Sequence, residues 1–341
     1  MQNIFGETFT NLEHFFLEHK EKKFKATQVY EWLYQKRVKS FQEMHNLKKE
    51  TISLLEQHYT MNTITILTKQ EGIDVVKYLL KLEDNNKIEA VLMKHNYGNS
   101  LCVSSQVGCN MSCTFCESGR LKKVRNLQTY EMVEQILLIE QDLKERISHI
   151  VLMGIGETFY NYENIIHFID IINHPKSFAI GSRHITISTC GVIPKIKEFM
   201  NYDKQVNLAV SLHAPNDTLR SKIMPINKVY PIKELLPVLK EYIKKTNRRI
   251  TFEYILLDNV NDTVECAKEL VNLLKGINCY VNLIPYNETS HIEYKKSKKE
   301  NIDRFFQILH ENKLNVTVRR EFGSNVKAAC GQLRADYEEE K

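Results

Sequence analysis

The pattern of hydrophobic and polar positions changes twice along the chain. Over residues 1–60, apolar side chains recur at helical spacing among lysines and glutamates, which predicts short helices. Residues 62–94 form β-rich runs that are separated by Gly72–Ile73 and Asp84–Asn86, which predicts a small β-meander. The expected meander strands are Thr63–Thr68, Val75–Leu82 and Ile88–Met93.

From residue 100 onward, short apolar runs alternate with amphipathic segments such as Tyr130–Lys144. Strand–helix alternation over this length predicts a parallel α/β sheet or barrel, in which reactive groups lie at the C-terminal ends of the strands. We therefore expect a helical unit at 1–60, a linking meander at 61–94 and an α/β core at 95–336. The expected core strands are Leu101–Ser104, His149–Met153, His184–Ser188, Asn207–Leu212, Thr251–Leu256, Tyr280–Ile284 and Asn315–Val318.

Composition places the chain among ordinary globular proteins. It has 341 residues, of which 43% are hydrophobic and 26% are charged, and its formal net charge is +5. No apolar stretch approaches the length that crosses a membrane, and the first residues do not resemble a signal peptide, so we expect a cytoplasmic protein with no membrane partner. Basic clusters favour nucleic acid only weakly, because charged runs are usually solvated surface. They lie at Lys20–Lys25, Arg248–Arg249, Lys295–Lys299 and Arg319–Arg320.

Three closely spaced cysteines carry the strongest chemical signal. Cys109, Cys113 and Cys116 have C-x3-C-x2-C spacing in a loop after the first core strand. Three thiolates at this spacing can hold a [4Fe–4S] cluster and leave one iron open to an outside ligand. A zinc site would need a fourth ligand such as His149 or His184, neither of which has the spacing of a zinc finger. Three buried thiols are the remaining alternative.

Other candidate residues are ambiguous by themselves. Glycines in Gly154–Glu157 let the backbone approach a ligand, but a Gly-x-Gly pair is often only a turn. His213 alone would more often be a core histidine than a functional one. Cys102 and Cys330 are each compatible with a buried core thiol. Glu89 alone would be a solvated residue at a strand edge.

The surrounding motifs make the assignment more specific. Together with the aromatic Phe115 before the last cluster cysteine, they resemble the RlmN/Cfr family of radical S-adenosylmethionine RNA methyltransferases, in order from about residue 20 to residue 336. The chain departs from the usual family pattern at Thr158 and Cys190. The matching segments are Cys102–Cys109, Met153–Glu157, Ser188–Pro194, Ser211–Pro215, Met224–Asn227, Asn282–Pro285 and Ala329–Leu333.

The resemblance implies a partial (β/α)6 radical SAM barrel with a small N-terminal helical accessory domain. It implies that Cys109, Cys113 and Cys116 hold one [4Fe–4S] cluster. It also implies that Cys330 is methylated and adds its carbon to the base, that Cys102 then resolves the adduct as a disulfide, and that Glu89 is the proton acceptor. The implied S-adenosylmethionine contacts are Gly156, Glu157, Ser188, Ser211, Leu212, His213 and Asn287.

By the same resemblance, the substrate is an adenosine of large-subunit ribosomal RNA, and in some relatives also a transfer RNA adenosine beside the anticodon. The helical unit would handle RNA, and an electron donor such as flavodoxin or ferredoxin would reduce the cluster. The segments Ser211–Pro215, Arg248–Tyr254 and Gly331–Arg334 look more like enzymes that methylate C2 of adenine than like those that methylate C8. The C8 type stays an alternative, and so does a non-catalytic RNA-binding module that carries zinc or an iron–sulfur cluster.

Overall fold

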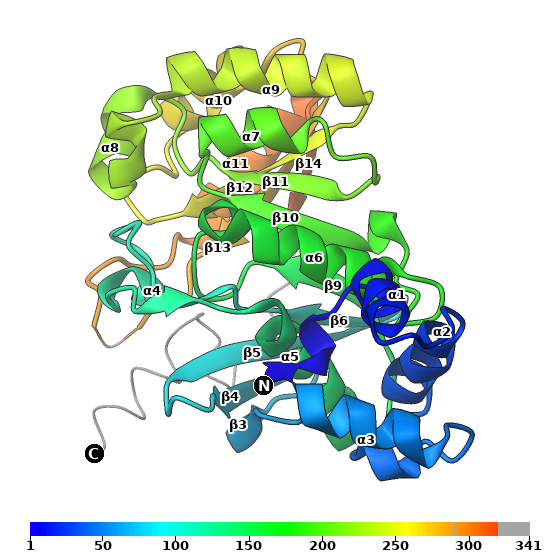
Figure 1. Ribbon diagram of the computed structural model, residues 1–341. Helices are drawn as coiled ribbons and strands as arrows, with labels where there is room; N and C mark the ends of the chain where they lie inside the picture. Colours follow the sequence, from blue (N-terminus) through cyan, green and yellow to red (C-terminus); the bar gives the residue numbers. More distant parts are fainter. Residues whose placement is uncertain (290, 320–341) are drawn as a thin grey trace.

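The central feature is a curved ten-stranded sheet in the order β14-β13-β12-β11-β10-β9-β6-β5-β4-β3. A computed structural model describes residues 1–289 and 291–319 (Figure 1). Strands β6 to β14 of this order pair in parallel. They are β6 (Gly98–Cys102), β9 (Ile147–Leu152), β10 (Ile185–Thr189), β11 (Asn207–Ser211), β12 (Ile250–Leu256), β13 (Cys279–Pro285) and β14 (Asn315–Val318).

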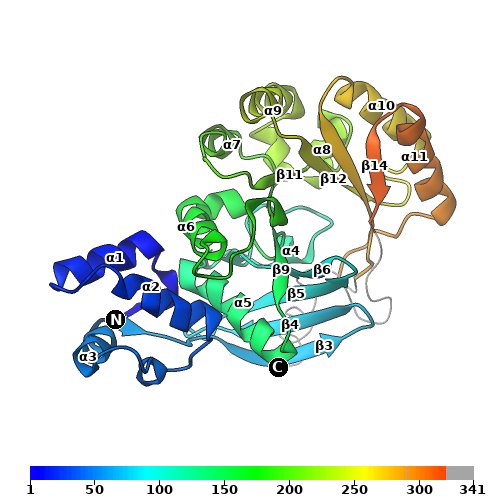
Figure 2. The same cartoon turned by 90° about the vertical axis from the view of Figure 1, so that its right-hand side faces the viewer.

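Amphipathic helices cover the outer face of the parallel strands, as Figures 1 and 2 show. The sheet has two different end strands, so the barrel stays open. Both observations confirm the predicted α/β fold with a partial parallel barrel. The helices are α5 (Thr129–Leu143), α6 (Tyr162–Asn173), α7 (Ile193–Phe199), α9 (Ile232–Thr246), α10 (Val264–Leu274) and α11 (Lys299–Glu311).

The predicted meander is present, and it continues the sheet of the barrel. Strands β3 (Thr65–Glu71), β4 (Val75–Lys81) and β5 (Lys87–His95) are antiparallel. β5 also pairs antiparallel with β6, where Val91 lies opposite Cys102. The meander therefore supplies one wall to the space inside the barrel.

The N-terminal region packs against α5 through η1 and through the residues beside β1 and β2. Asn3 Nδ2 donates to Glu134 Oε1 at 2.6 Å, and the backbone N–H groups of Thr63 and Ile64 donate to Glu134 Oε2 at 2.8 Å. One hydrophobic core continues from the N-terminal helices into the barrel. The elements are β1 (Gln2–Asn3), η1 (Ile4–Gly6), α1 (Phe9–Glu18), α2 (Lys25–Tyr30), η2 (Glu31–Gln35), η3 (Phe41–Glu43), α3 (Lys49–His58) and β2 (Tyr59–Thr60), and β1 pairs in parallel with β2.

Short elements follow the C-terminal ends of the barrel strands. Helices α4 and α8 both lie at this end of the sheet, on the left in Figure 1, with α8 above α4. In the described part of the chain, no helix is long and apolar enough to span a bilayer. The short elements are β7 (Gln106–Val107), α4 (Glu117–Arg120), β8 (Arg125–Asn126), η4 (Thr158–Asn161), η5 (Ser182–His184), α8 (Asp217–Ile223) and η6 (Pro225–Lys228).

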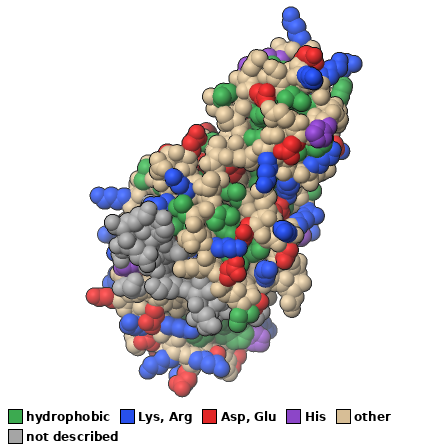
Figure 3. All heavy atoms as spheres, turned by 90° about the horizontal axis from the view of Figure 1, so that it is seen from below, with side chains coloured by type: hydrophobic (Ala, Val, Ile, Leu, Met, Phe, Trp, Pro, Cys, Tyr) green, Lys and Arg blue, Asp and Glu red, His purple; other side chains and the backbone are tan. Residues whose placement is uncertain are grey.

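The surface carries charges of both signs. Seen from below, lysine and arginine side chains lie around the rim with aspartate and glutamate between them, and hydrophobic side chains show near the centre (Figure 3). Several lysines are ion-paired, such as Lys69 with Asp142 at 2.9 Å and Lys94 with Glu145 at 3.4 Å. The net charge is small because 42 acidic residues nearly balance 47 basic ones.

Candidate functional site

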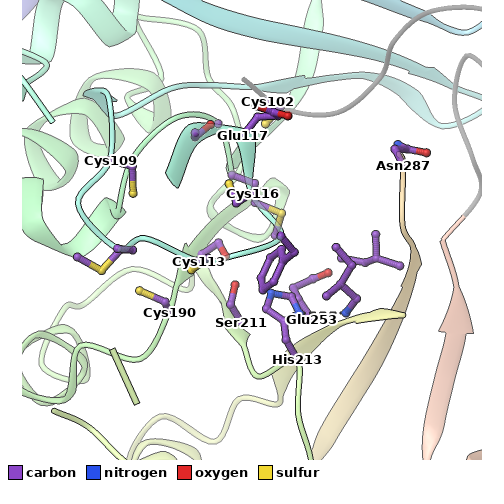
Figure 4. A pocket seen from close by; sticks show the side chains of 18 of the residues that line it. Cys102, Cys109, Cys113, Cys116, Glu117, Cys190, Ser211, His213, Glu253 and Asn287 are labelled. Carbon is purple, nitrogen blue, oxygen red and sulfur yellow. Dashed lines mark hydrogen bonds between the residues drawn. The ribbon is translucent and has the colours of Figure 1, made fainter. Parts of the chain in front are cut away.

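A cavity of about 340 Å³ opens at the C-terminal ends of the barrel strands. Figure 4 shows how side chains from distant segments point toward it. The cavity brings together most of the residues that the sequence singled out. These are Cys102, Cys109, Cys113, Cys116, Gly156, Glu157, Ser188, Ser211, His213 and Asn287.

Hydrogen bonds hold the cysteine loop on both sides. Within the loop, the N–H of Cys116 donates to the carbonyl of Cys113 at 3.1 Å, and the N–H of Cys109 donates to Leu121 O at 2.8 Å. On the barrel side, Thr114 N–H donates to the carbonyl of Ile223 at 3.0 Å. Since Ile223 is the last residue of α8, that helix fixes the loop against the end of β11.

The three thiols suit an iron–sulfur cluster. Burial raises the pKa of Cys109 to about 11, and burial also raises the pKa values of Cys113 and Cys116. A metal that binds these sulfurs must displace their protons, and thiolate is the ligand that iron–sulfur clusters require. The thiols border the cavity, which leaves space for a cluster and for a ligand on its open iron. The donor set and the adjoining space therefore fit the group that the spacing predicts.

Glu157 is the centre of a buried hydrogen-bond network. Its carboxylate accepts from Thr189 Oγ1 at 2.7 Å, from Phe159 N at 3.0 Å, and from both the backbone N–H and the thiol of Cys190 at 2.8 Å. Burial and the charge of Glu157 hold the pKa of Cys190 well above its usual value, so this thiol stays protonated and donates. Cys190, one of the two departures from the family pattern, therefore supports the carboxylate.

Gly156 is needed for the approach of two strand ends. Its φ is +118°, and a Cβ there would lie 2.7 Å from the Cβ of Gln106. The side chain of Gln106 in turn accepts the backbone N–H of Glu157 at 2.9 Å. Only glycine permits this contact, which sets the position of Glu157 at the cavity.

His213 is held in a strained and defined orientation. Its φ is +56°, a left-handed conformation that is uncommon for a residue with a side chain. Nδ1 accepts the backbone N–H of Ile255 at 3.0 Å, and the carbonyl of His213 accepts from Asn261 Nδ2 at 2.8 Å. Burial and then the charge of Arg220 lower the pKa of His213 to about 3. The ring is therefore neutral, and the proton lies on Nε2.

Arg220 on α8 is a site residue that the sequence analysis missed. Its guanidinium is fully buried and donates to the carbonyls of Leu212 (3.1 Å), Cys190 (2.7 Å) and Ser211 (2.9 Å) and to Asn227 Oδ1 (2.9 Å). It thereby ties the end of β11 to the residue that follows β10. An arginine in a short amphipathic helix carries no sequence signal that separates it from a surface arginine.

Glu253 on β12 is a second residue that was missed. It is 5% exposed, it lines the cavity, and its Oε2 accepts from Asn282 Nδ2 at 2.7 Å. Burial raises its pKa, while the charge of Arg319 and the bond from Asn282 oppose that rise. One feature of the sequence could have indicated its role, because it is a charged residue inside an otherwise apolar strand.

The opposite wall of the cavity is mainly apolar. Cys102, at the end of β6, packs with Val75 and Met93 of the meander. Burial raises the pKa of Cys102 to about 11, and the nearby charge of Arg319 opposes that rise. Its sulfur is a free thiol in the described part of the chain. Most of this thiol is therefore protonated at neutral pH.

Two predicted site residues in the described part of the chain, Leu212 and Glu89, are not among those that line the cavity. Leu212 is fully buried in the core beneath it, and its backbone N–H donates to Glu253 O at 3.1 Å. Glu89 is 1% exposed on β5, and its carboxylate lies 3.6 Å from Lys77 Nζ. Cys330 lies outside the described residues.

The histidines considered as zinc ligands lie elsewhere. The rings of His149 and His184 stack on each other with centroids 4.3 Å apart, and neither residue lines the cavity. In the described part of the chain, no three His, Cys, Asp or Glu side chains surround a position for a single ion. The three cysteines border the cavity of about 340 Å³, away from these two histidines.

Comparison with known proteins agrees with this geometry. The model of the radical SAM superfamily matches residues 103–274, and that of the ribosomal RNA large subunit methyltransferase N-terminal domain matches residues 2–61. A protein of Spiroplasma citri, named probable dual-specificity RNA methyltransferase RlmN, is 52% identical over 99% of both chains. The chain belongs to the RlmN/Cfr family of radical SAM RNA methyltransferases. A Listeria monocytogenes protein with the same name is 53% identical and covers 98% of this chain and 93% of its own.

A solved structure supports the same relationship. A radical SAM methyltransferase from Sphaerobacter thermophilus superposes with a TM-score of 0.92 at 36% identity, over 97% of this chain and 99% of that chain. The protein is therefore an S-adenosylmethionine-dependent RNA methyltransferase, and the alternative of a non-catalytic binding module is wrong. Membership of this superfamily also implies a [4Fe–4S] cluster.

Proposed function

We propose that the protein methylates C2 of an adenosine in large-subunit ribosomal RNA, and a second adenosine in transfer RNA. The relatives carry the name dual-specificity RNA methyltransferase RlmN, and the chain matches them over nearly its full length. The observation that carries the proposal is the cavity, because it places the Cys102 thiol in the same space as the three cysteines of the cluster loop.

The residues around the cavity suit a radical reaction. Carbon 2 of adenine is electron-poor and does not attack a sulfonium methyl group, whereas a carbon radical can add to it. The cluster and S-adenosylmethionine, when bound, supply a 5′-deoxyadenosyl radical. The chain's own residues position these groups and keep water away. In this proposal, Cys109, Cys113 and Cys116 hold the cluster.

Several polar residues would hold the cofactor. Gly156 allows backbone approach at the end of β9, and the network around Glu157 fixes a carboxylate that can accept from an ammonium group. Ser188, Ser211 and Asn287 line the same cavity. Leu212 would act indirectly, because its side chain lies in the core, its N–H donates to Glu253 O and its carbonyl accepts from Arg220, which together hold Ser211 and His213 in place.

The two thiols have separate roles. Cys330 carries the methyl group whose carbon joins the base, Glu89 accepts the proton that leaves the base, and Cys102 attacks Cys330 to form a disulfide and release the RNA. The high pKa of Cys102 keeps it unreactive until that step. A thiol reductant and an electron donor such as flavodoxin or ferredoxin complete the cycle.

Mass spectrometry of RNA tests which carbon is methylated. The chain is expressed in cells that lack their own enzyme of this type, and ribosomal and transfer RNA are digested to nucleosides. We expect 2-methyladenosine in both RNAs and none with Cys330→Ala. Finding 8-methyladenosine instead would assign the chain to the C8 type.

Trapping the adduct tests the roles of the thiols. Cys102→Ala should still join its Cys330 to the base but should not release it, so an RNase-sensitive covalent adduct should appear on a denaturing gel. Cys266→Ala, at a half-buried position on α10, is the matched control and should form no adduct. A Cys102→Ala protein with a full cluster and no adduct would contradict this division of roles.

A further inference from the structure

A second cavity, of about 470 Å³, lies at the other end of the barrel from the cysteine loop. Its walls come from the end of η2 and the residues after it, from the end of α5, and from the loop that follows α6. The α5 and α6 segments lead into β9 and β10, so this cavity lies at the N-terminal ends of those strands. In Figure 1, α2, which continues into η2, lies on the right, whereas α4 beside the cysteine loop lies on the left. The second cavity is therefore separate from the site described above.

Three buried donor atoms at this cavity lack an acceptor. Tyr34 Oη, Arg37 Nη1 and Ser177 Oγ make no hydrogen bond to any residue that the structure describes. Tyr34 is 1% exposed and Ser177 is 4% exposed, and all three residues line the cavity. Burial raises the pKa of Tyr34, so its hydroxyl stays protonated and can donate. A buried donor without an acceptor is costly, and three of them around one cavity call for an acceptor from a bound molecule.

The guanidinium of Arg37 is held in a defined position. Its Nη2 donates to the carboxylate of Glu140, and its plane lies over the ring of Phe178, 4.5 Å from the ring centroid. The backbone of Arg37 is left-handed, with φ at +57°, and so are those of Lys144 (+56°) and Ala179 (+51°), which line the same cavity. Backbone strain of this kind is concentrated at functional sites. The fixed guanidinium leaves Nη1 as its free donor toward a ligand.

The charges around the cavity favour an anion. Both lining carboxylates already have donors. Glu140 accepts from Arg37 and from the backbone N–H of Ile147 at 2.9 Å, and Glu145 accepts from Asn99 Nδ2 at 2.8 Å. The cations that line the cavity outnumber these carboxylates, because they are Arg37, Lys144 and Arg146.

We propose that this cavity binds a small phosphate anion, which is inorganic phosphate or the phosphate end of a small ester. A phosphate group offers at least three oxygens, one for each free donor, and guanidinium and hydroxyl groups are common partners of phosphate. Donors buried this deeply are out of reach of the phosphates of an RNA helix, which lie between bulky neighbouring nucleotides. A small anion can enter, because the rim side chains Gln35, Gln141 and Lys144 are exposed and free to rotate.

A bound phosphate would join two parts of the chain. Tyr34 and Arg37 belong to the N-terminal region, whereas Ser177 belongs to the loop between α6 and β10 of the barrel. An anion that accepts from all three therefore bridges the two regions and stabilises the folded protein. This inference does not depend on which carbon of adenine is methylated.

Calorimetric titration of the full chain with its cluster tests the proposal, with inorganic phosphate as the first probe and glycerol 3-phosphate as the second. We expect saturable binding at one site, and the tighter of the two probes identifies the free anion or the ester as the ligand class. Tyr34→Phe and Ser177→Ala each remove one hydroxyl and should weaken binding about tenfold. The double variant should weaken it about a hundredfold.

Thermal unfolding separates binding from a structural role. Because the hydroxyl of Tyr34 has no partner, Tyr34→Phe should not lower the Tm in phosphate-free buffer. Phosphate should raise the Tm of the unaltered protein and should leave that of the double variant unchanged. Tyr30→Phe is the matched control, since Tyr30 packs on Tyr34 with ring centroids 4.9 Å apart but donates to Glu7 O at 2.7 Å. It should lower the Tm and keep the affinity for phosphate.

Three results would overturn the proposal. The first is a double variant that binds phosphate as tightly as the unaltered protein, or an unaltered protein that shows no saturable binding. The second is a rise in Tm that sodium chloride reproduces at equal ionic strength, because that would be a general effect of salt. The third is displacement of phosphate by a short RNA with hydroxyl ends, which would make the RNA backbone the ligand.

Discussion

The cavity wall along the ends of β9 to β12 is a network of hydrogen bonds, whereas the wall formed by β4, β5 and β6 is mostly apolar. On the first wall, Glu157, Arg220 and His213 each make several hydrogen bonds with fixed partners. On the second, Cys102 packs with Val75 and Met93. Both walls face the same cavity of about 340 Å³.

The difference reflects what each wall has to do. A cofactor with a carboxylate, an ammonium and ribose hydroxyls is positioned by preorganised polar groups, which need no rearrangement when it binds. A thiol that reacts only in the last step is better kept in apolar surroundings, where its pKa is high and it stays protonated.

The largest effect is expected for the cluster loop. Cys113→Ala should reduce bound iron and sulfide to background and abolish cleavage of S-adenosylmethionine, because two thiolates cannot hold the cube. Anaerobic iron and sulfide analysis with absorption spectra measures this. Cys266→Ala should keep a full cluster. If Cys113→Ala retained the cluster, another residue would have to supply the third ligand.

Arg220→Met tests the polar wall. It leaves the carbonyls of Leu212, Ser211 and Cys190 without their donor, and each such loss costs about 1–3 kcal/mol. We expect the free energy of unfolding in urea to fall by more than about 3 kcal/mol. Lys222→Met, at an exposed position of the same helix, should change it by less than about 0.5 kcal/mol. An equal decrease in the free energy of unfolding in the two variants would show that Arg220 does not hold the strand ends together.

Variants of the buried ion pair in the meander distinguish a loss of stability from a loss of RNA methylation. Glu89→Gln removes the carboxylate that lies 3.6 Å from Lys77 in a fully buried setting, and should cost about 3 kcal/mol. Adding Lys77→Met should restore most of that stability, because the second buried charge is removed as well. If Glu89 is the proton acceptor, RNA methylation should stay low in the double variant. Recovery of methylation together with stability would give Glu89 a structural role only.

The smallest perturbation is a change of pH. Alkylation requires the thiolate, and burial raises the pKa of Cys102 to about 11. The rate of Cys102 alkylation should therefore keep rising with pH until the pH is about 11. Brief pulses of iodoacetamide with mass spectrometry of the Cys102 peptide measure the midpoint. In urea-unfolded protein the midpoint should return to about 8.5. A midpoint near 8.5 in the folded protein would mean that the apolar wall does not protect the thiol.

The sequence predicted the parts of the molecule that depend on local pattern. Apolar runs located the parallel strands, although β6 runs over Gly98–Cys102 rather than Leu101–Ser104 and β10 begins at Ile185 rather than at His184. Cysteine spacing identified the cluster loop. Arg220 and Glu253 could not be predicted, because their roles depend on partners from other segments. The guanidinium of Arg220 meets carbonyls from two strand ends, and the carboxylate of Glu253 meets Asn282 on the neighbouring strand.

The buried contacts of Glu134 have a consequence for how the protein can be dissected. Its carboxylate accepts hydrogen bonds from Asn3, Thr63 and Ile64, and the apolar side chains of the N-terminal helices belong to the same core as the barrel. The helices and the barrel should therefore melt in a single cooperative transition. Deletion of the N-terminal region should therefore destabilise the barrel as well. Its contribution to RNA affinity is best measured by substituting surface lysines rather than by truncation.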